Sequence, residues 1–480
     1  MRPTRREFLA AGAAVGTAAY AAACAEPGGR DTRVERPNVV VVVLDTFRAD
    51  HAYGPRARTP AFDELTRRGL RFATVFPEAM PTVPARNSIL SGRRQFPFRN
   101  WQKQPGLLDH AGWSALDDVP TAFPSVLRRA GWWTAYVTDN PFLGFASPYQ
   151  ELRDSFDVFV RHGGQIGGRD VPVPARLLNH WLHPALARTD SRERVRRFLA
   201  NADYSHDERK SFAAQVFSSA MDTLDRTPRR RPFAMVVDSF EPHEPWTPPR
   251  QYVDLYGDPS YHGPEPATPR YGRANSWLHP DEMKLVLSRM RALYAAELTM
   301  TDHWLGMLLE RVERMERPTL VLLVSDHGIF FGERGWTGKI SVALHPELTQ
   351  VPLVIVDPDG RRAGQESAYL ASTHDVGPTI LSMAGVRVPH AMDGTDLSTL
   401  FDHRSPPRRD FAYGGYSDQH YVRTGRWTYM SDNRFERPKL FDVKQDPHEQ
   451  RDVAAEHPDV VAELQEDLRR RIGGRPPYYG

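Results

Sequence analysis

Side chains able to bind a metal lie at the ends of three apolar runs of the sequence. Asp45, Asp238 and the pair Asp326-His327 lie at or just beyond these ends; the runs are residues 39–44, 233–237 and 319–324. Ligands of open parallel sheets bind beyond the carboxyl ends of the strands, so we expect these groups to converge. Carboxylates and imidazoles bind divalent cations such as Zn, Mn, Mg or Ca. The pattern therefore predicts a metal site formed by Asp45, Asp326 and His327, although any single aspartate here is as readily a loop carboxylate or a helix cap.

A hydroxyl and a guanidinium lie four residues apart in a second segment. Thr82 precedes Arg86, and Pro81 and Pro84 stiffen the chain around them. We expect this segment to open a helix, which would place Thr82 in the positive field of a helix N-terminus. That position suits an anionic ligand.

The elements that must position these residues alternate between strands and helices. Residues 39–44 form an unbroken apolar run, typical of a strand buried on both faces of a parallel sheet. Thr59 and Pro60 then predict the N-cap and first residue of a helix that ends at Gly69. Further helices are expected at 124–130 and 283–312, and further strands at 133–137, 233–238, 319–324 and 351–356. This order predicts an α/β fold with a large, mostly parallel sheet flanked by helices.

The pattern of the sequence changes near residue 364. Shorter apolar runs follow, among them a strand-like segment at 421–430 and an amphipathic helix at 458–472. We therefore expect a catalytic domain at 37–364 and a smaller α+β C-terminal subdomain at 365–480 that completes the fold.

The N-terminal residues have the features of an export signal. A pair of arginines at positions 5 and 6 precedes a run of small apolar residues, 10–23, which is too short to span a membrane. We expect a twin-arginine signal at 1–24, a linker at 25–36, and a mature protein that is exported to a periplasmic or other extracytoplasmic location. Cys24 follows three alanines and is a candidate for lipidation, which would tether the protein to a membrane. Simple cleavage nearby is the alternative, because the branched residue usual in a lipoprotein box is missing.

Composition excludes several classes of protein. Lys and Arg number 62 against 60 Asp and Glu, a formal charge of +2, so we expect no nucleic-acid partner. The single cysteine excludes an intrachain disulfide and a paired-cysteine metal site. A hydrophobic fraction of 40% provides a folded core, so the chain is not intrinsically disordered.

From residue 37 to the end, the order of these motifs resembles the sulfatase branch of the alkaline phosphatase superfamily. The matching segments are Pro37-Asn38, Asp45, Thr82-Val83-Pro84-Ala85-Arg86, Pro242-His243-Glu244-Pro245, Ser325-Asp326-His327-Gly328, Gly338-Lys339, His374-Asp375-Val376-Gly377-Pro378-Thr379, Asp393-Gly394, Leu440-Phe441-Asp442 and Asp446-Pro447-His448-Glu449. No single segment is specific for the family, but this many segments in the family's order are specific for it.

The resemblance implies a role for each matching residue. A divalent metal would be held by Asp45, Asp326 and His327, next to Thr82 at the nucleophile position. Arg86 would orient the nucleophile and the anionic oxygens of the ester. His243 and Lys339 would contact the substrate or protonate the leaving group. The alternatives are that Lys339 is solvated, that His243 is a hydrogen-bond donor of a loop, and that Arg86 pairs with a structural carboxylate.

Three departures from the family pattern change the expected chemistry. Threonine at position 82 has a secondary alcohol, so no formylglycine is expected. Threonine nucleophiles are characteristic of superfamily relatives that act on phosphorus esters, so the resemblance favours esters of phosphorus. Thr46 and His327 replace a carboxylate and an amide, which favours a transition metal over calcium. The family's substrate-binding Lys and His are absent from 138–141, and Glu241 or His374 is a candidate for a second metal or for the missing proton donor.

The main hypothesis is therefore an exported, metal-dependent hydrolase of phosphate, phosphonate or sulfate esters. Thr82 would act as the nucleophile through a covalent phospho-threonine, on a small anionic ester, a glycan or a lipid headgroup. A formylglycine-independent sulfatase is the first alternative. The second, from another class, is a catalytically silent surface protein that binds anionic glycans or lipids.

Overall fold

The structure, a computed structural model, describes residues 36–168, 171–202 and 207–480. The predicted export signal, the lipidation of Cys24 and nearly all of the predicted linker lie outside these residues. Across the described ranges, no helix is both long enough and apolar enough to cross a membrane.

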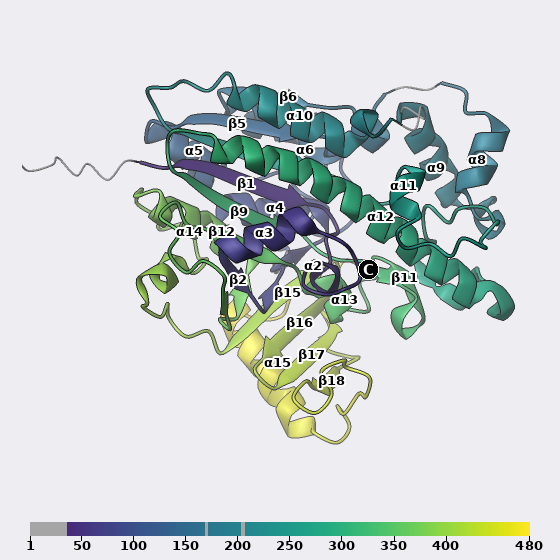
Figure 1. Cartoon of the computed structure of the whole chain (residues 1–480). Helices are drawn as coiled ribbons and strands as arrows, with labels where there is room; N and C mark the ends of the chain where they lie inside the picture. The colour runs from purple at the N-terminus through teal and green to yellow at the C-terminus, as the bar shows by residue number, and fades with distance from the viewer. Residues whose placement is uncertain (1–35, 169–170, 203–206) are drawn as a thin grey trace, which may run out of the picture. The chain divides into compact units, whose positions relative to one another are not determined.

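An eight-stranded sheet forms the centre of residues 37–480 (Figure 1). Its strands lie in the order β13 (Gln365–Ser367), β2 (Leu70–Phe72), β12 (Leu353–Val356), β9 (Thr319–Ser325), β1 (Asn38–Leu44), β7 (Phe233–Ser239), β5 (Trp133–Thr138) and β6 (Val158–Arg161). All neighbours pair in parallel except β12, which is antiparallel to both β9 and β2. The predicted mostly parallel sheet is confirmed.

Helices cover both faces of the sheet, which explains the unbroken apolar run in β1. Side chains alternate between faces along a strand, so Val40 and Val42 contact one helical layer while Val39 and Val41 contact the other. The first layer includes α3 (Pro60–Arg68), α10 (Phe212–Leu224) and α12 (Pro280–Glu313), of which α10 and α12 lie in front of the sheet in Figure 1. The second includes α4 (Thr82–Ser91), α5 (Phe123–Arg129) and α14 (Val376–Met383).

A second, five-stranded sheet lies in the C-terminal part of the chain. Its order is β18 (Lys439–Asp442), β17 (Trp427–Asp432), β16 (Gln419–Thr424), β15 (Phe411–Tyr416) and β4 (Ala79–Met80), and α15 (Pro458–Ile472) packs against it. Helix α15 has the predicted bounds. The predicted single strand at 421–430 is wrong, because the chain turns back after Thr424. The hydroxyl of Thr424 accepts hydrogen bonds from the amides of Arg426 and Trp427 and stabilises this turn.

Shorter elements connect these layers. They are α2 (Ala49–Ala52), α6 (Pro141–Phe145), α7 (Gln150–Asp154), α8 (Ala175–Trp181), α9 (Asp190–Asn201), α11 (Arg250–Val253) and α13 (Pro346–Thr349), with the small strands β3 (Val75–Phe76), β8 (Gly272–Arg273), β10 (Phe330–Phe331), β11 (Trp336–Gly338) and β14 (Ala371–Ser372). Strand β13 lies beyond residue 364 yet belongs to the main sheet. The second sheet begins its C-terminal strands only at Phe411, and the domain boundary at 364 stays a prediction.

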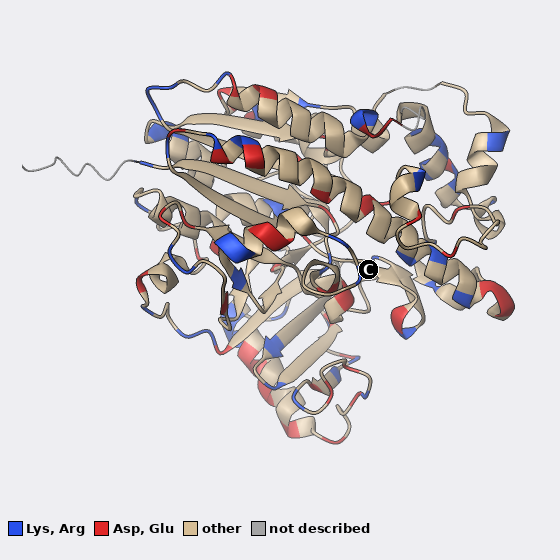
Figure 2. Ribbon diagram, viewed as in Figure 1, with Lys and Arg blue, Asp and Glu red and all other residues tan. Residues whose placement is uncertain are grey.

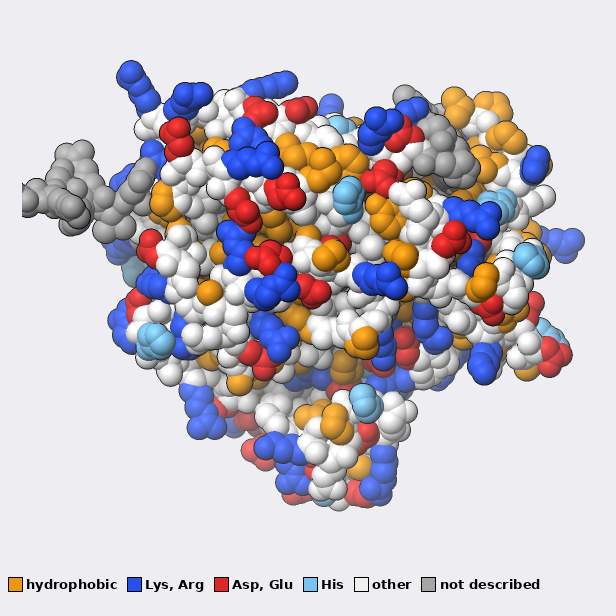
Figure 3. Space-filling view, in the orientation of Figure 1, with side chains coloured by type: hydrophobic (Ala, Val, Ile, Leu, Met, Phe, Trp, Pro, Cys, Tyr) orange, Lys and Arg blue, Asp and Glu red, His pale blue; other side chains and the backbone are white. Residues whose placement is uncertain are grey.

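Charged side chains of both signs lie interspersed over the elements of the ribbon in Figure 2. The face shown in Figure 3 likewise carries basic, acidic and apolar side chains side by side. That face presents no continuous basic surface of the kind that binds nucleic acid.

The N-terminus of α3 is capped by a residue that the sequence did not indicate. The helix begins at Pro60 and is followed by Gly69, as predicted, but the Thr59 side chain makes no capping hydrogen bond. Asp302 of α12 instead accepts hydrogen bonds from the amides of Ala61 and Phe62, each at 2.9 Å. A carboxylate from another helix satisfies these amides.

We expect Asp302→Ala to lower the free energy of unfolding by about 2–3 kcal/mol, because two amides lose a buried acceptor. Thr59→Ala is the control and should cost less than about 1 kcal/mol, since no capping bond is removed. Urea denaturation followed by circular dichroism measures both values. Equal losses in the two variants would contradict this account of the cap.

Candidate active site

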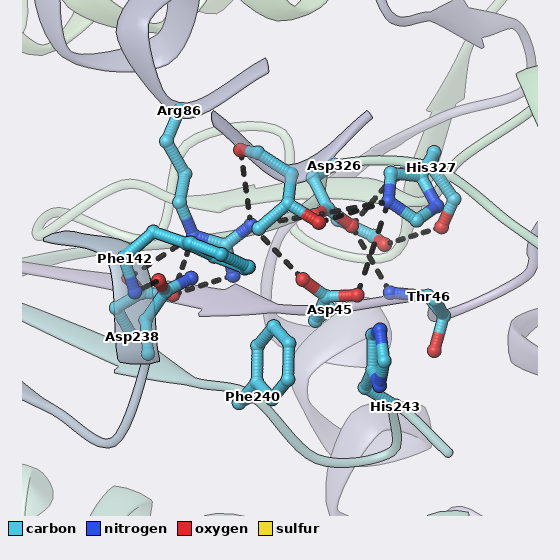
Figure 4. Close-up of polar contacts among 12 residues, drawn as sticks. Asp45, Thr46, Arg86, Phe142, Asp238, Phe240, His243, Asp326 and His327 are labelled. Carbon is cyan, nitrogen blue, oxygen red and sulfur yellow. Dashed lines mark hydrogen bonds and ion pairs between the residues drawn. The ribbon is translucent and has the colours of Figure 1, made fainter. Parts of the chain in front are cut away.

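The carboxyl ends of two neighbouring strands, β1 and β9, bring the predicted metal ligands together. Strand β1 lies between β9 and β7, and Leu44 pairs with Ser325 on one side and Ser239 on the other. The residues that follow these positions therefore meet at one edge of the sheet. Figure 4 shows Asp45, Asp326 and His327 facing one another there.

Asp45, Asp326 and His327 form a fully buried group whose ligand atoms all lie within 4.8 Å of one another. His327 Nε2 is 3.5 Å from Asp326 Oδ2 and 3.9 Å from Asp45 Oδ1. His327 Nδ1 lies 2.9 Å from the carbonyl oxygen of Gly328, to which it must donate, so Nε2 keeps its lone pair toward the carboxylates. Asp45 Oδ1 is buried without a hydrogen-bond partner. These residues fit a divalent cation.

The protonation of this group also suits a cation. Burial, reinforced by the neighbouring charge of Asp326, raises the pKa of Asp45. Burial lowers the pKa of His327, which keeps its imidazole neutral and able to coordinate. A cation between the two carboxylates would relieve the repulsion that a proton on Asp45 otherwise relieves.

Arg86 pairs with carboxylates from all three strand ends. Its Nε and Nη2 donate to Asp238 at 2.7–3.1 Å, and its Nη1 donates to Asp45 at 3.1 Å and to Asp326 at 2.5 Å. Burial alone would lower the pKa of Arg86, but these carboxylates raise it well above its usual value. The alternative in which Arg86 pairs with a structural carboxylate is therefore realised through Asp238. Its contact with substrate oxygens stays a prediction.

Thr82 lies beside the metal-ligand group, as the sequence predicted. It is the first residue of α4 and is 3% exposed. Its Oγ1 is 3.5 Å from His327 Nε2, the nitrogen that faces the two carboxylates. The hydroxyl therefore lies within reach of any cation held by this group.

Lys339 and His243 meet at the other side of the site, and two partners that the sequence did not single out hold them there. Lys339 Nζ lies 3.0 Å from His243 Nε2 and 2.8 and 2.9 Å from the two carboxylate oxygens of Glu244. Tyr271 also donates to Glu244. Lys339 is 7% exposed, so it is not a solvated side chain. Glu244 belongs to the matching segment Pro242-His243-Glu244-Pro245, which was the sequence signal for its involvement.

The imidazole of His243 is neutral in this arrangement. Burial lowers the pKa of His243 to about 3, and its Nδ1 contacts the backbone carbonyl of Glu244. Burial would raise the pKa of Glu244, but the neighbouring cations Lys339 and Arg194 outweigh it and hold that pKa below the usual value. Lys339 Nζ therefore donates both to the neutral imidazole and to the carboxylate.

Glu241 and His374, the candidates for a second metal, lie apart from this group. Among the described residues, the metal-ligating cluster contains neither of them. Glu241 accepts a hydrogen bond from the amide of Ala213 at 2.7 Å. Burial together with the charges of Arg94 and Arg409 lowers the pKa of His374, and these two cations oppose a metal there.

A cavity of about 560 Å³ opens onto Thr82, His243 and Lys339. Its lining combines apolar and aromatic side chains with the charged side chains of α9. The site therefore combines a buried candidate metal group, a hydroxyl at a helix N-terminus and a buried cation, beside a cavity of ligand size. This combination on an α/β sheet defines a hydrolase of anionic esters.

Comparison with known proteins places the chain within that class. The family model for Sulfatase matches residues 37–386, and a model described as N-sulphoglucosamine sulphohydrolase, C-terminal, matches residues 332–474. The chain belongs to the sulfatase family, and it is an ester hydrolase of that family.

Two relatives and one solved structure show the extent of this similarity. An arylsulfatase of Clostridium perfringens is 23% identical and the match covers 92% of this chain and 96% of that protein. A choline-sulfatase of Rhizobium meliloti is 26% identical, with 87% and 82% covered. A phosphonate monoester hydrolase of Silicibacter pomeroyi has a TM-score of 0.68 at 19% identity, with 92% and 96% covered.

We expect the purified protein to bind about one divalent ion per chain, and Asp326→Ala to bind less than about a tenth of that amount. His374→Gln is the control and should keep the full stoichiometry. Affinity should fall as the pH falls, because protons compete for Asp45, whose pKa is raised by burial. Elemental analysis and calorimetry with Mn²⁺ or Zn²⁺ measure these quantities. Unchanged binding in Asp326→Ala would exclude this group as the metal site.

Proposed function

We propose that this protein hydrolyses singly charged esters of phosphorus, either phosphate diesters or phosphonate monoesters, with Thr82 as the nucleophile. The observation that carries the proposal is the 3.5 Å approach of Thr82 Oγ1 to His327 Nε2 at the wall of the cavity. A secondary alcohol cannot be oxidised to an aldehyde, so the unmodified hydroxyl of Thr82 is the group at this position that supports nucleophilic attack. A divalent cation held by Asp45, Asp326 and His327 would lower the pKa of a nearby hydroxyl and neutralise ester oxygens.

The reaction would proceed in two displacements. Thr82 Oγ forms a bond to phosphorus and its proton passes to water, while the bond from phosphorus to the leaving oxygen breaks. The leaving oxygen takes a proton from Lys339. Water then attacks phosphorus, the bond to Thr82 breaks and Thr82 Oγ takes one proton of that water, which releases the second product and restores the free hydroxyl. Lys339 regains a proton from solvent, which replaces the one given to the leaving oxygen.

The charges of the site favour a substrate with one negative charge. Arg86 and Lys339 are both already paired with carboxylates, and the carboxylates outnumber these two buried cations; they are Asp45, Asp238, Asp326 and Glu244. One divalent cation would bring this group to neutrality. A phosphate monoester would add a second negative charge without a counterion, which costs free energy in a buried site.

The identity of the metal and the location of this protein are two further proposals, and both rest on the sequence. Imidazole in the ligand group and a hydroxyl at Thr46 support a transition metal such as Mn or Zn over calcium. The arginine pair at positions 5 and 6 supports export out of the cytoplasm.

We expect Thr82→Val to lower kcat at least about a thousandfold and Thr82→Ser to retain activity within about tenfold. Intact mass spectrometry of the quenched wild-type enzyme should show Thr82 carrying the phosphoryl group of the substrate. Retention of activity by Thr82→Val would exclude Thr82 as the nucleophile.

Removal of Lys339 should affect poor leaving groups most. We expect Lys339→Met to lower kcat/KM by about 10²–10⁴-fold for phenyl or alkyl leaving groups and far less for nitrophenol, which needs no proton. His243→Gln, which retains a hydrogen-bonding side chain, should show no such dependence on the leaving group. Equal losses across a series of aryl esters would argue against Lys339 as the acid.

A formylglycine-independent sulfatase is the second candidate, because sulfate esters also carry one charge and two sulfatases are among the relatives of this chain. Matched aryl phosphodiester and aryl sulfate substrates separate the two functions. A clear preference for the sulfate would overturn the assignment to phosphorus.

A further inference from the structure

The walls of the cavity differ in character, which bears on the group that the ester carries. The floor holds Thr82, His243 and Lys339, and an aromatic row leads away from it. Phe240 stacks on His243 with ring centroids 4.1 Å apart, and Phe142 lies 6.5 Å from Phe240. Figure 4 shows Phe240 beside His243, with Phe142 on the other side of Phe240. An apolar path therefore begins at the reacting group.

Two exposed aliphatic side chains line the same cavity as this aromatic row. Trp113 continues the row in an edge contact with Phe142 at 4.7 Å. Leu108 and Ile166, which also line the cavity, are 44% and 49% exposed. Covering exposed aliphatic side chains with a ligand is favourable, because it removes apolar surface from water.

The structure fixes both aliphatic residues relative to the catalytic floor. Gln165, next to Ile166, donates a hydrogen bond to the backbone carbonyl of His243 at 2.9 Å. Gly106, two residues before Leu108, has a φ of +78° and lies so close to Ala146, which follows α6, that a Cβ there would be 3.3 Å from the Ala146 Cβ. The two residues thus border a preformed cavity.

The charged part of the lining offers little to a second charged group of the substrate. It is formed by α9, whose Arg197 donates to Glu193 at 2.8 Å. Arg194 lies over the ring of Tyr271 at 4.8 Å and 3.9 Å from Glu244. The charged residues of α9 in the lining, Asp190, Glu193, Arg194 and Arg197, carry two charges of each sign, so the apolar part of the lining is the stronger determinant of binding.

We propose that the natural substrate is an amphiphile, an ester whose apolar aliphatic or aromatic group lies along Phe142 and Trp113 and covers Leu108 and Ile166. This inference rests on the proposed function for the position of the anionic end. It adds the class of the attached group, which the reaction itself does not specify.

Binding of a homologous series of alkyl sulfonates tests the apolar wall separately from the chemistry. Methane-, butane- and hexanesulfonate carry one negative charge and have no ester bond to cleave, so they report binding even if Thr82 is not the nucleophile. Calorimetry on the metal-loaded wild-type protein should show affinity rising about three- to fourfold per added methylene. Affinity that is independent of chain length would overturn the proposal.

Three single variants identify the residues that cause the rise in affinity with chain length. Leu108→Ser and Ile166→Ser should each reduce the hexane-to-methane affinity ratio about fivefold or more while leaving the affinity for methanesulfonate unchanged. Leu285→Ser is the matched control, because Leu285 is also 49% exposed but lies on α12 and does not line the cavity. An equal reduction in the control would overturn the assignment of the wall.

Free amphiphiles and membrane lipids share this chemistry, and a second arm separates them. The wild-type enzyme is given a soluble hexyl aryl phosphodiester and, separately, phosphatidylglycerol vesicles. Faster turnover of the soluble hexyl ester than of its methyl analogue assigns free amphiphiles, and turnover of the vesicle lipid assigns lipids. If the hexyl ester is turned over no faster than its methyl analogue and the vesicle lipid is not turned over, the proposal of an amphiphilic substrate is wrong.

Discussion

Burial of three carboxylates at one edge of a parallel sheet is the constraint on which the site depends. Asp45, Asp238 and Asp326 have no exposed surface. An unpaired charge at such a buried position costs several kcal/mol. Arg86 contacts all three. Because Arg86 lies one helical turn after Thr82, and its guanidinium also donates to the Thr82 carbonyl, the pairing that neutralises the carboxylates also places the hydroxyl.

The charges of the site are held in position before any substrate enters. Lys339 reaches the cavity from β11 and its connecting loop, and Glu244 fixes its ammonium from the opposite side. Arg86 is held independently by Asp238, whose carboxylate also accepts a hydrogen bond from Tyr136. Groups that are already oriented need no reorganisation as charge develops on an ester oxygen, which is the main source of electrostatic catalysis.

The second sheet takes part in building the site, because one of its strands precedes the nucleophile. Met80 of β4 pairs with Tyr416 of β15, and α4 begins two residues later at Thr82. Tyr416 also lines the cavity. The C-terminal strands therefore anchor the chain that delivers Thr82.

The sequence by itself determined the features that repeat locally or end an element. The apolar run of β1, helix 458–472, the start of α4 at Thr82 and the convergence of Asp45, Asp326 and His327 follow from side-chain periodicity and from the geometry of parallel strands. Tertiary structure alone decided which charges pair. Asp238 lies 152 residues from Arg86, Glu244 lies 95 from Lys339, and Asp302 caps α3 from another helix. Such pairs leave no periodic pattern in the chain, because their energy comes from burial and from distances that exist only after the layers pack.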